Sequence, residues 1–277
     1  MTLVLIGPAC EDLIIIGDKE NSKVGGASYF QSFVYEEFNE DYLAIVNASS
    51  EDLINSFPDK SKVKLILKDE THHFINEYPD KDNLDIRRQS TNFANVPILS
   101  DELKNIFEEC EIDNDDIDAF VLTPLNSNDF PIETLEFLKT FEVPIYVSLQ
   151  GFLRFMDEDN SMILKLSDNL DHVFDISDTI FMDESEFDII KSEKFADSNL
   201  VITNGSKGSR IIEVDNTSIR INAVKCDNIV DATGCGDTYM AAYISARLKN
   251  KTFKNSADFA SMIASKKLEN YGPYKKS

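Results

Sequence analysis

From about residue 100 onward, the chain alternates between amphipathic helical segments and short apolar strands. The four predicted helix–strand pairs are residues 101–110 with 119–122, 132–141 with 145–148, 162–170 with 179–182, and 184–191 with 200–203. This alternation is typical of a parallel sheet covered by helices on both faces. Ligands of such sheets bind beyond the carboxyl ends of the strands, so we expect functional residues at the strand-to-helix junctions.

The N-terminal third follows a different pattern. Apolar strands are predicted at residues 3–6 and 43–46, with a helix from Gly26 to about residue 38 between them. Residues 63–67, 72–78 and 84–88 are short alternating segments separated by polar turns, and no helix fits between them. We therefore expect one α/β domain spanning residues 1–277, with a β-rich insertion at about 60–92 that also takes in about 13–24.

The C-terminal part is predicted to contain a hairpin and two closing helices. The hairpin strands are expected at residues 210–214 and 218–221, a short strand at 228–230, and the helices at 236–249 and 256–270.

The charge of the chain limits its partners. The sequence has 277 residues with 27 Lys and Arg against 50 Asp and Glu, a formal net charge of −23. Nucleic-acid binding normally needs a positive face, and anionic membranes repel an acidic protein, so neither partner is expected. The N-terminus lacks a signal-peptide pattern and the four cysteines form no C-x-x-C pair, which favours a cytoplasmic protein with reduced thiols.

The most informative stretch precedes the first closing helix. Residues 231–239 read DATGCGDTY. Gly234 and Gly236 remove side chains where a helix begins, so that backbone N–H groups and the helix dipole can bind an anion. Asp237 would be repelled by that anion unless it has a chemical task. A carboxylate beside a phosphate site is what a phosphoryl transferase needs to take a proton from an alcohol.

This segment resembles the C-terminal signature D-[TS]-x-G-A-G-D-x-F of the ribokinase-like, or PfkB-type, carbohydrate kinases. The resemblance implies the family fold, a three-layer sandwich with a central, mostly parallel sheet and a small β-sheet lid. It implies that Asp237 is the catalytic base and that the amides of Gly234, Cys235 and Gly236 form the anion hole. Ala232, Cys235 and Tyr239 depart from the signature, and a thiol at Cys235 beside the phosphate path suggests sensitivity to thiol reagents.

The resemblance extends to the predicted substrate side. Asp12 follows the first strand, where the family has an Asp that binds substrate hydroxyls. Gly25 and Gly26 resemble the family's glycine-rich substrate loop, and we expect Ser28 to substitute in part for an Asn that the family often has further on. The segment from Ser148 to Arg154 resembles the family pattern D-x-[NQ]-G-x-x-R. There, Gln150 and Arg154 are the expected substrate contacts.

Two further matches concern the donor. Asp183 and Glu186 stand where the family has N-x-x-E after a strand, which implies that they hold Mg²⁺ through water. Residues 203–208 resemble the family's nucleotide loop T-x-G-x-x-G, and the nucleotide contacts implied there are Thr203, Gly205, Lys207 and Gly208. Thr233 is a further implied nucleotide contact. The implied cofactors are ATP and Mg²⁺. Whether a monovalent cation is a further cofactor is left open. The exposed lid strands suggest a homodimer paired through the lid.

The resemblance implies a kinase acting on an alcohol of a sugar or a polyol. A nucleoside is the alternative acceptor, because Phe30, Phe74 and Phe152 are candidates to stack on a base. A catalytically silent, sugar-sensing protein of the same fold is the other alternative. It is favoured by Ala232, by Ser148 and by the altered substrate loop.

Overall fold

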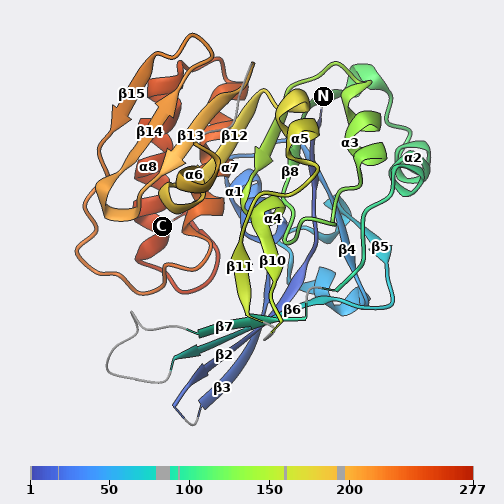
Figure 1. The fold of residues 1–277 in the computed structure, drawn as a ribbon, viewed down its shortest axis with the longest axis horizontal. Helices are drawn as coiled ribbons and strands as arrows, with labels where there is room; N and C mark the ends of the chain where they lie inside the picture. Colours follow the sequence, from blue (N-terminus) through green and yellow to red (C-terminus); the bar gives the residue numbers. More distant parts are fainter. Residues whose placement is uncertain are drawn as a thin grey trace.

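A nine-stranded sheet forms the centre of the computed structural model, which describes residues 2–17, 19–78, 88–92, 94–158, 161–191 and 197–276 (Figure 1). The strand order is β15-β14-β13-β12-β9-β8-β1-β4-β5. All neighbours are parallel from β13 to β5, whereas β14 and β15 form an antiparallel edge. The sheet strands are β1 (Thr2–Ile6), β4 (Tyr42–Ala48), β5 (Val63–Leu67), β8 (Ile117–Leu122), β9 (Ile145–Ser148), β12 (Thr179–Asp183), β13 (Asn199–Thr203), β14 (Ser209–Ile212) and β15 (Ser218–Ile221).

Helices cover both faces of this sheet, as the alternation predicts. The helices are α1 (Ala27–Glu37), α2 (Ser100–Glu109), α3 (Ile132–Lys139), α4 (Gln150–Leu153), α5 (Leu170–Ile176), α6 (Glu184–Ile190), α7 (Cys235–Leu248) and α8 (Phe253–Leu268). Alternate residues of β1 face opposite ways: Leu3 and Leu5 belong to the core beneath α1, α7 and α8, whereas Val4 and Ile6 belong to the core beneath α2 to α6. The molecule is therefore the expected three-layer α/β sandwich.

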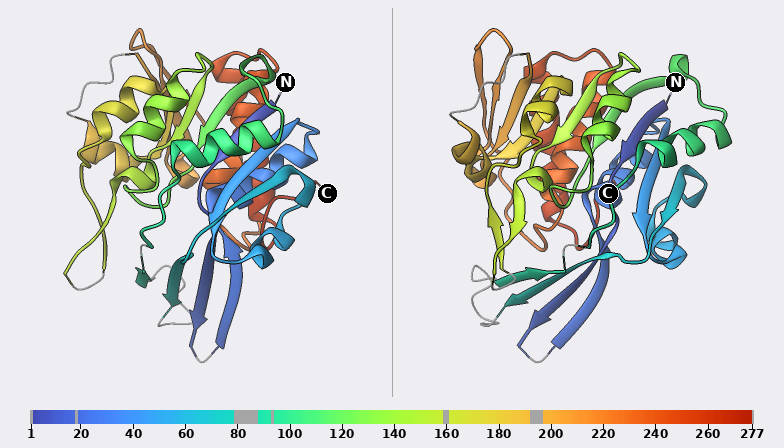
Figure 2. Two further views of the ribbon diagram at one scale, coloured as in Figure 1. Left: turned by 90° about the vertical axis from the view of Figure 1, so that its right-hand side faces the viewer. Right: turned by 45° about the vertical axis from the view of Figure 1, so that its right-hand side comes forward.

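A separate four-stranded sheet projects from one end of the sandwich (Figure 2). Its order is β3-β2-β6-β7, with β2 at Cys10–Ile16, β3 at Lys19–Gly25, β6 at His72–Tyr78 and β7 at Arg88–Thr91. We call this sheet the lid. The hairpin of β2 and β3 and the strands after residue 72 together build it, in line with the expected contribution of about 13–24. The predicted strand at 84–88 lies mostly outside the described residues.

The expected lid boundary at residue 60 is wrong. Val63–Leu67 pairs in parallel with β4 and forms the edge of the central sheet, where Ile66 packs in the core beneath α2 to α6. Two 3₁₀ turns, Glu51–Ser56 and Lys60–Lys62, supply the crossover between β4 and β5. An alternating apolar pattern identifies a strand but does not say which sheet it joins.

Two other expected elements differ. The helix predicted at 162–170 is instead a strand, β11 (Met162–Leu164), paired with β10 (Arg154–Met156), and α5 begins only at Leu170. Residues 228–230 do not form the predicted strand and have no ladder pairing; there, the Val230 N–H donates to the carbonyl of Leu268 in α8. Both differences arise because tertiary contacts, rather than local apolar pattern, decide short segments.

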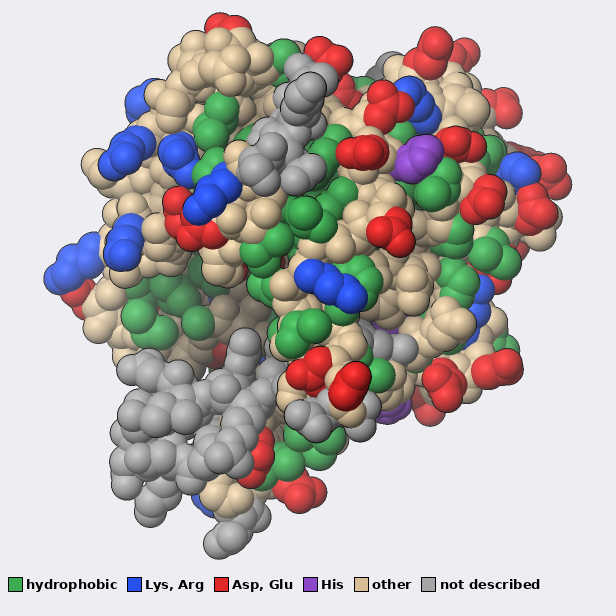
Figure 3. Space-filling view, viewed as in Figure 1, with side chains coloured by type: hydrophobic (Ala, Val, Ile, Leu, Met, Phe, Trp, Pro, Cys, Tyr) green, Lys and Arg blue, Asp and Glu red, His purple; other side chains and the backbone are tan. Residues whose placement is uncertain are grey.

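The acidic surface is uneven. On the face drawn in Figure 3, Asp and Glu side chains prevail over the half that carries α2 and α3, whereas Lys and Arg gather over the half with β13 to β15. Within the described part of the chain, no helix combines the length and the apolar character needed to span a membrane.

Candidate active site

A cavity of about 300 Å³ lies where the lid meets the start of α7. It brings together residues that are far apart in the sequence. From the lid side come Asp12 and Gly26, and from the segment after β9 come Gln150 and Arg154. The loop before α7 contributes the run from Ala232 to Asp237. Most of the residues predicted for substrate and catalysis therefore share one cavity.

The loop geometry at the start of α7 requires a glycine at position 234 but not at position 236. Gly234 is the N-cap, with φ at +73°, and a Cβ placed there would lie 2.3 Å from the ring of Phe30. A side chain at this position would be strained and would collide with the ring. A Cβ at Gly236 would meet nothing within 4 Å, so this glycine leaves the backbone open toward the cavity. Helix α7 has fourteen residues, and its N-terminal dipole favours an anion here.

One predicted anion-hole amide has a partner already. The Cys235 N–H donates to the Ala232 carbonyl at 3.2 Å, a long turn-type bond. For this amide to bind a phosphate oxygen, the hydrogen bond would have to be shared or released. The Cys235 thiol donates to the Ala264 carbonyl of α8 at 3.6 Å, and burial raises the pKa of this thiol to about 11. A raised pKa disfavours the thiolate, which is the reactive form, so it opposes the expected sensitivity to thiol reagents.

Asp237 lies in the first turn of α7 and lines the cavity. Burial raises the pKa of its carboxyl to about 6; the Arg154 guanidinium opposes this increase and the Asp12 carboxylate adds to it. A carboxyl with a pKa near 6 is ionised at neutral pH, and it is a stronger base than an exposed Asp. The environment therefore suits a proton acceptor.

The lid contributes charged and polar groups from neighbouring strands. In the register of the lid, Asp12 of β2 stands between Lys23 of β3 and Phe74 of β6. Gly25 permits a close approach, because a Cβ there would lie 2.4 Å from the Asp12 carboxylate. Asp12 is 8% exposed, and the Cys10 thiol donates to it at 3.6 Å. These contacts hold the carboxylate in the wall of the cavity.

Sequence reasoning missed Lys23 and Asn76, which also line the cavity. The Lys23 ammonium is buried and has no hydrogen-bond partner within the described residues, although it lies 5.6 Å from the centre of the Tyr271 ring. The strand register would have revealed both positions, because Lys23 stands opposite Asp12 and Asn76 is two residues beyond Phe74 on the same strand face. A lysine and an asparagine in a polar strand give no other signal.

Glu186 and Asp183 form a capping box at the start of α6. The Asp183 N–H donates to the Glu186 carboxylate at 2.8 Å, and the Glu186 N–H donates to the Asp183 carboxylate at 2.9 Å. Burial and the Asp183 charge raise the pKa of Glu186 to about 7, against the lowering effects of the Asp183 backbone hydrogen bond, Arg154 and the Gln150 side chain. Neither carboxylate lines the cavity, but Gln150 and Arg154 connect Glu186 to it.

Several predicted site residues lie outside the cavity. Ser28 is fully buried, and its hydroxyl contacts the Thr123 hydroxyl at 2.7 Å and the Gly7 carbonyl at 3.3 Å, so it holds the end of β1 rather than a substrate. Phe152 is fully buried in the core beneath α2 to α6, whereas Phe30 and Phe74 line the cavity.

The predicted nucleotide loop lies beside the cavity rather than in it. Thr203, at the end of β13, is in register with Asp183 at the end of β12. Gly205 and Lys207 follow in an exposed turn. Position 208 requires a glycine for a structural reason: its φ is +91°, and a Cβ there would lie 2.0 Å from the Ile221 carbonyl. Of the predicted nucleotide contacts, Thr233 alone lines the cavity.

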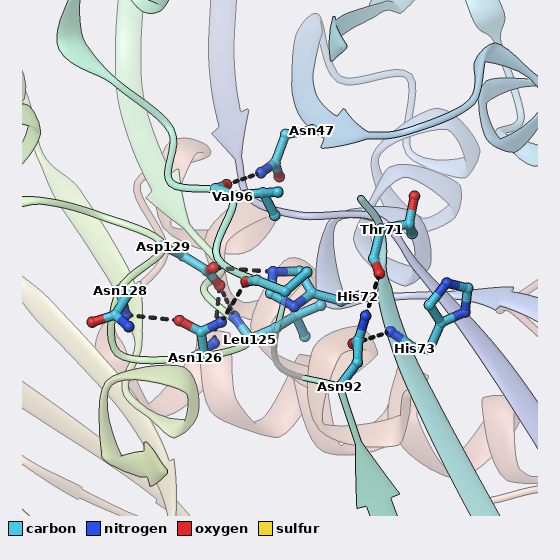
Figure 4. A network of polar contacts seen from close by, with 11 residues as sticks. Asn47, Thr71, His72, His73, Asn92, Val96, Leu125, Asn126, Asn128 and Asp129 are labelled. Atoms are coloured by element: carbon cyan, nitrogen blue, oxygen red, sulfur yellow. Dashed lines mark hydrogen bonds and ion pairs between the residues drawn. The ribbon is translucent and has the colours of Figure 1, made fainter. Parts of the chain in front are cut away.

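A buried polar network joins the lid to the body (Figure 4). His72, the first residue of β6, is fully buried, and its Nε2 lies 3.1 Å from the Asp129 carboxylate. Asp129 also accepts hydrogen bonds from the N–H groups of Leu125 and Asn126, at 2.6 and 2.9 Å. Leu125 lines the cavity, so this network connects the base of the lid to the cavity wall.

Sequence comparison finds similarity to known proteins in the C-terminal part of the chain. Residues 149–277 match the model of the pfkB family carbohydrate kinase. A segment of 50 residues is 42% identical to a nucleoside kinase of Methanocaldococcus jannaschii. That segment covers 18% of this chain and only 16% of that kinase.

Solved structures match over nearly the full length. A pyrophosphate-dependent kinase in the ribokinase family, complexed with a pyrophosphate analog and myo-inositol, has a TM-score of 0.79 and 17% identity, and covers 99% of this chain and 97% of that one. Arabidopsis thaliana ribokinase, complexed with ribose and ATP, has a TM-score of 0.73 and 18% identity, with 98% and 93% covered. Burkholderia thailandensis nucleoside kinase in complex with inosine has a TM-score of 0.72 and 16% identity, with 98% and 92% covered. Residues 149–277 thus match the pfkB family carbohydrate kinase model, and the whole chain has the ribokinase-like fold.

Proposed function

We propose that this protein transfers the γ-phosphoryl group of ATP to an alcohol of a sugar or a polyol. The observation that carries the proposal is Asp237, a carboxyl with a raised pKa, in the first turn of α7 directly after a glycine-rich loop. An anion-binding helix start beside a proton acceptor is the arrangement that phosphoryl transfer to a hydroxyl requires.

The residues of the cavity divide the task. The acceptor alcohol lies between Asp12, Asn76 and Gln150, whose oxygen and amide groups hydrogen-bond hydroxyls. Asp237 takes the proton of the attacking hydroxyl, while the loop of residues 234–236 and α7 stabilise the transferred phosphoryl group. Lys23 and Arg154 supply positive charge against the phosphate in an otherwise acidic protein.

The described residues suit a magnesium ion that is bound through water. Among the described residues no group of three or more His, Cys, Asp or Glu side chains could hold a metal directly. Asp183 and Glu186 each use an oxygen in the capping box and keep further lone pairs, which suits an ion that retains several waters. When bound, Mg²⁺ would neutralise donor phosphate charge. We assign Asp183 and Glu186 as its outer ligands.

A nucleoside is the second candidate acceptor. Phe30 and Phe74 line the cavity and present aromatic surface on which a base could stack. A sugar or polyol remains the first choice, because the wall that carries Asp12, Asn76 and Gln150 is polar. Structural neighbours that were solved with ribose, with myo-inositol and with inosine represent all three acceptor classes.

The test is formation of ADP that depends on an added alcohol. We would assay the purified protein with Mg²⁺ and ATP against panels of sugars, inositols and nucleosides, and repeat the assay with pyrophosphate as donor. Asp237→Asn serves as the inactive reference, and Asp171→Asn, at an exposed position of α5, as the matched control. Turnover in the wild type and in Asp171→Asn but not in Asp237→Asn supports the proposal. Tight ligand binding without turnover across all panels would favour the sensing protein instead.

A further inference from the structure

Lys267 has a buried ammonium group that contacts the loop preceding α7. It lies in the last turn of α8, and its side chain is 0% exposed. Its Nζ donates to the Asp231 carbonyl at 2.6 Å and lies 3.6 Å from the Asp231 carboxylate. Removing a lysine from water is costly unless its charge is paired and hydrogen-bonded, so this placement calls for a reason.

The same carboxylate organises the loop through both of its oxygens. Asp231 accepts the Thr233 N–H at 2.8 Å and the Gly272 N–H at 3.0 Å. The Val230 N–H donates to the Leu268 carbonyl at 2.8 Å. The end of α8 therefore holds the start of the loop through its backbone and through the Lys267 side chain.

The oxygens around the Lys267 ammonium are a carbonyl and a carboxylate of one residue. Oxygens of this kind are the ligands that a small hard cation would take. In this chain the positive charge is covalently attached and reaches the loop from a neighbouring helix. Burial lowers the pKa of Lys267, while the Asp231 carboxylate acts in the opposite direction and favours the charged form.

We propose that the Lys267 ammonium is a built-in cation of the phosphate-binding loop, which fixes residues 231–236 for the donor phosphate and makes a bound monovalent cation unnecessary. This inference rests on the proposed function, because it assumes that the loop binds phosphate. Lys267 is a positioning residue: it contacts Asp231 and not the cavity. Its loss would let the loop move and would remove one positive charge near the phosphate.

The first experiment needs no substitution. Wild-type protein is titrated with inorganic pyrophosphate and with ATP in buffers whose only monovalent cation is K⁺, Na⁺ or tetramethylammonium. We expect affinities that agree within about a factor of two across the three cations. Stimulation of binding by K⁺ of about tenfold would overturn the inference, because it would show that the loop needs a free cation.

The second experiment removes the tethered charge. Lys267→Met should weaken pyrophosphate and ATP binding by about tenfold or more in tetramethylammonium, and K⁺ or ammonium should restore part of the loss. Lys266→Met, at the exposed neighbouring position of α8, carries the same charge change and should bind like the wild type. A general structural defect would weaken binding without responding to small cations.

Two outcomes separate this inference from the proposed function. If the wild type binds neither pyrophosphate nor ATP, both fail. If the wild type binds them and Lys267→Met binds equally well, the inference about Lys267 alone fails. Should Lys267→Met not fold, Lys267→Gln keeps a polar donor beside the Asp231 carbonyl without the charge, and the same rescue by small cations is then required of it.

Discussion

The two walls of the cavity are built in different ways. Residues 231–237 form the loop before α7 and the first turn of that helix, and Lys267 at the end of α8 contacts them. The two helices pack on each other and on the core of the central sheet. The lid wall consists of strands that project from the body, and its small apolar cluster of Cys10, Phe74 and Leu125 spans lid and body. The phosphate side is therefore tied into the core, whereas the acceptor side depends on a few polar and apolar contacts at the base of the lid.

This difference assigns different tasks to the two walls. Transition-state stabilisation requires groups held in fixed positions, which a packed helix start provides. Recognition of an acceptor tolerates and often uses a movable wall, because closure can exclude water from the cavity. We expect substitutions on the loop side to lower turnover, and substitutions on the lid side to change acceptor affinity and local stability.

The largest effect is expected at Asp237. Asp237→Asn should lower turnover by about two to four orders of magnitude, the range for loss of a general base. Its donor binding should stay close to that of the wild type, as measured by titration with ATP. Because burial of the charged carboxylate costs stability, the melting temperature of this variant at pH 7 should not fall. Unchanged turnover would rule out Asp237 as the base.

Gly234 tests whether the loop must keep its shape. Gly234→Ala places a Cβ against the Phe30 ring at a left-handed backbone position, so we expect a loss of about 2–3 kcal/mol of unfolding free energy together with weaker phosphate binding. Gly17→Ala is the matched control on the lid, with φ at +58° and nothing within 4 Å of the added Cβ. Denaturant titration should show the smaller loss for Gly17→Ala. Equal losses would mean that backbone strain alone, and not the contact with Phe30, accounts for the effect.

The pH dependence follows from the same carboxyl. Asp237 must be ionised to accept a proton, so kcat/KM should rise with pH through about 6 and then level off. One unit below this pKa, the rate should be lower by about tenfold. The stability contribution of Asp237 has the opposite sign: a folded pKa raised from 3.8 to about 6 means that ionisation costs stability as pH rises through this interval. A flat rate profile between pH 5 and 8 would contradict the role of Asp237.

The smallest effect is expected at the base of the lid. His72→Ala leaves the buried Asp129 carboxylate without one partner and should cost about 1–3 kcal/mol of unfolding free energy. It should raise KM for the acceptor more than KM for the donor, because the network lies on the lid side. His73→Ala is the control: this half-exposed ring pairs with Glu11, and its loss should cost less than about 1 kcal/mol. A larger effect on donor KM than on acceptor KM would break the proposed division between the walls.

Much of the α/β frame could be predicted from the chain because its pattern is strong. Each predicted parallel strand after residue 100 is buried on both faces and so has a nearly continuous apolar run. The predictions for short segments were wrong where pairing with a distant strand decided the secondary structure. Val63–Leu67 has the same alternating pattern as a lid strand but pairs with β4 of the central sheet. Met162–Leu164 pairs with Arg154–Met156 instead of forming a helix.

The residues of the candidate site also differ in whether their role could be predicted from the sequence. The run of residues 231–237 is contiguous in sequence, and its glycines and carboxylate predicted a helix start with an acid beside it. Ser28 was misplaced because a hydroxyl in a glycine-rich loop looks the same in sequence whether it faces a ligand or the Thr123 hydroxyl. Lys23, Asn76 and Lys267 gave no signal, since their importance depends on residues that lie far from them in the chain.

The sequence by itself determined the alternating α/β frame and the loop before α7, because both depend on interactions between residues close together in the chain. Only the tertiary structure decided which strands form the lid, how Asp12, Arg154 and Asp237 come to share one cavity, and that the Lys267 ammonium reaches Asp231. Those features depend on strand pairing and helix packing between distant segments, and on burial that raises the pKa of Asp237.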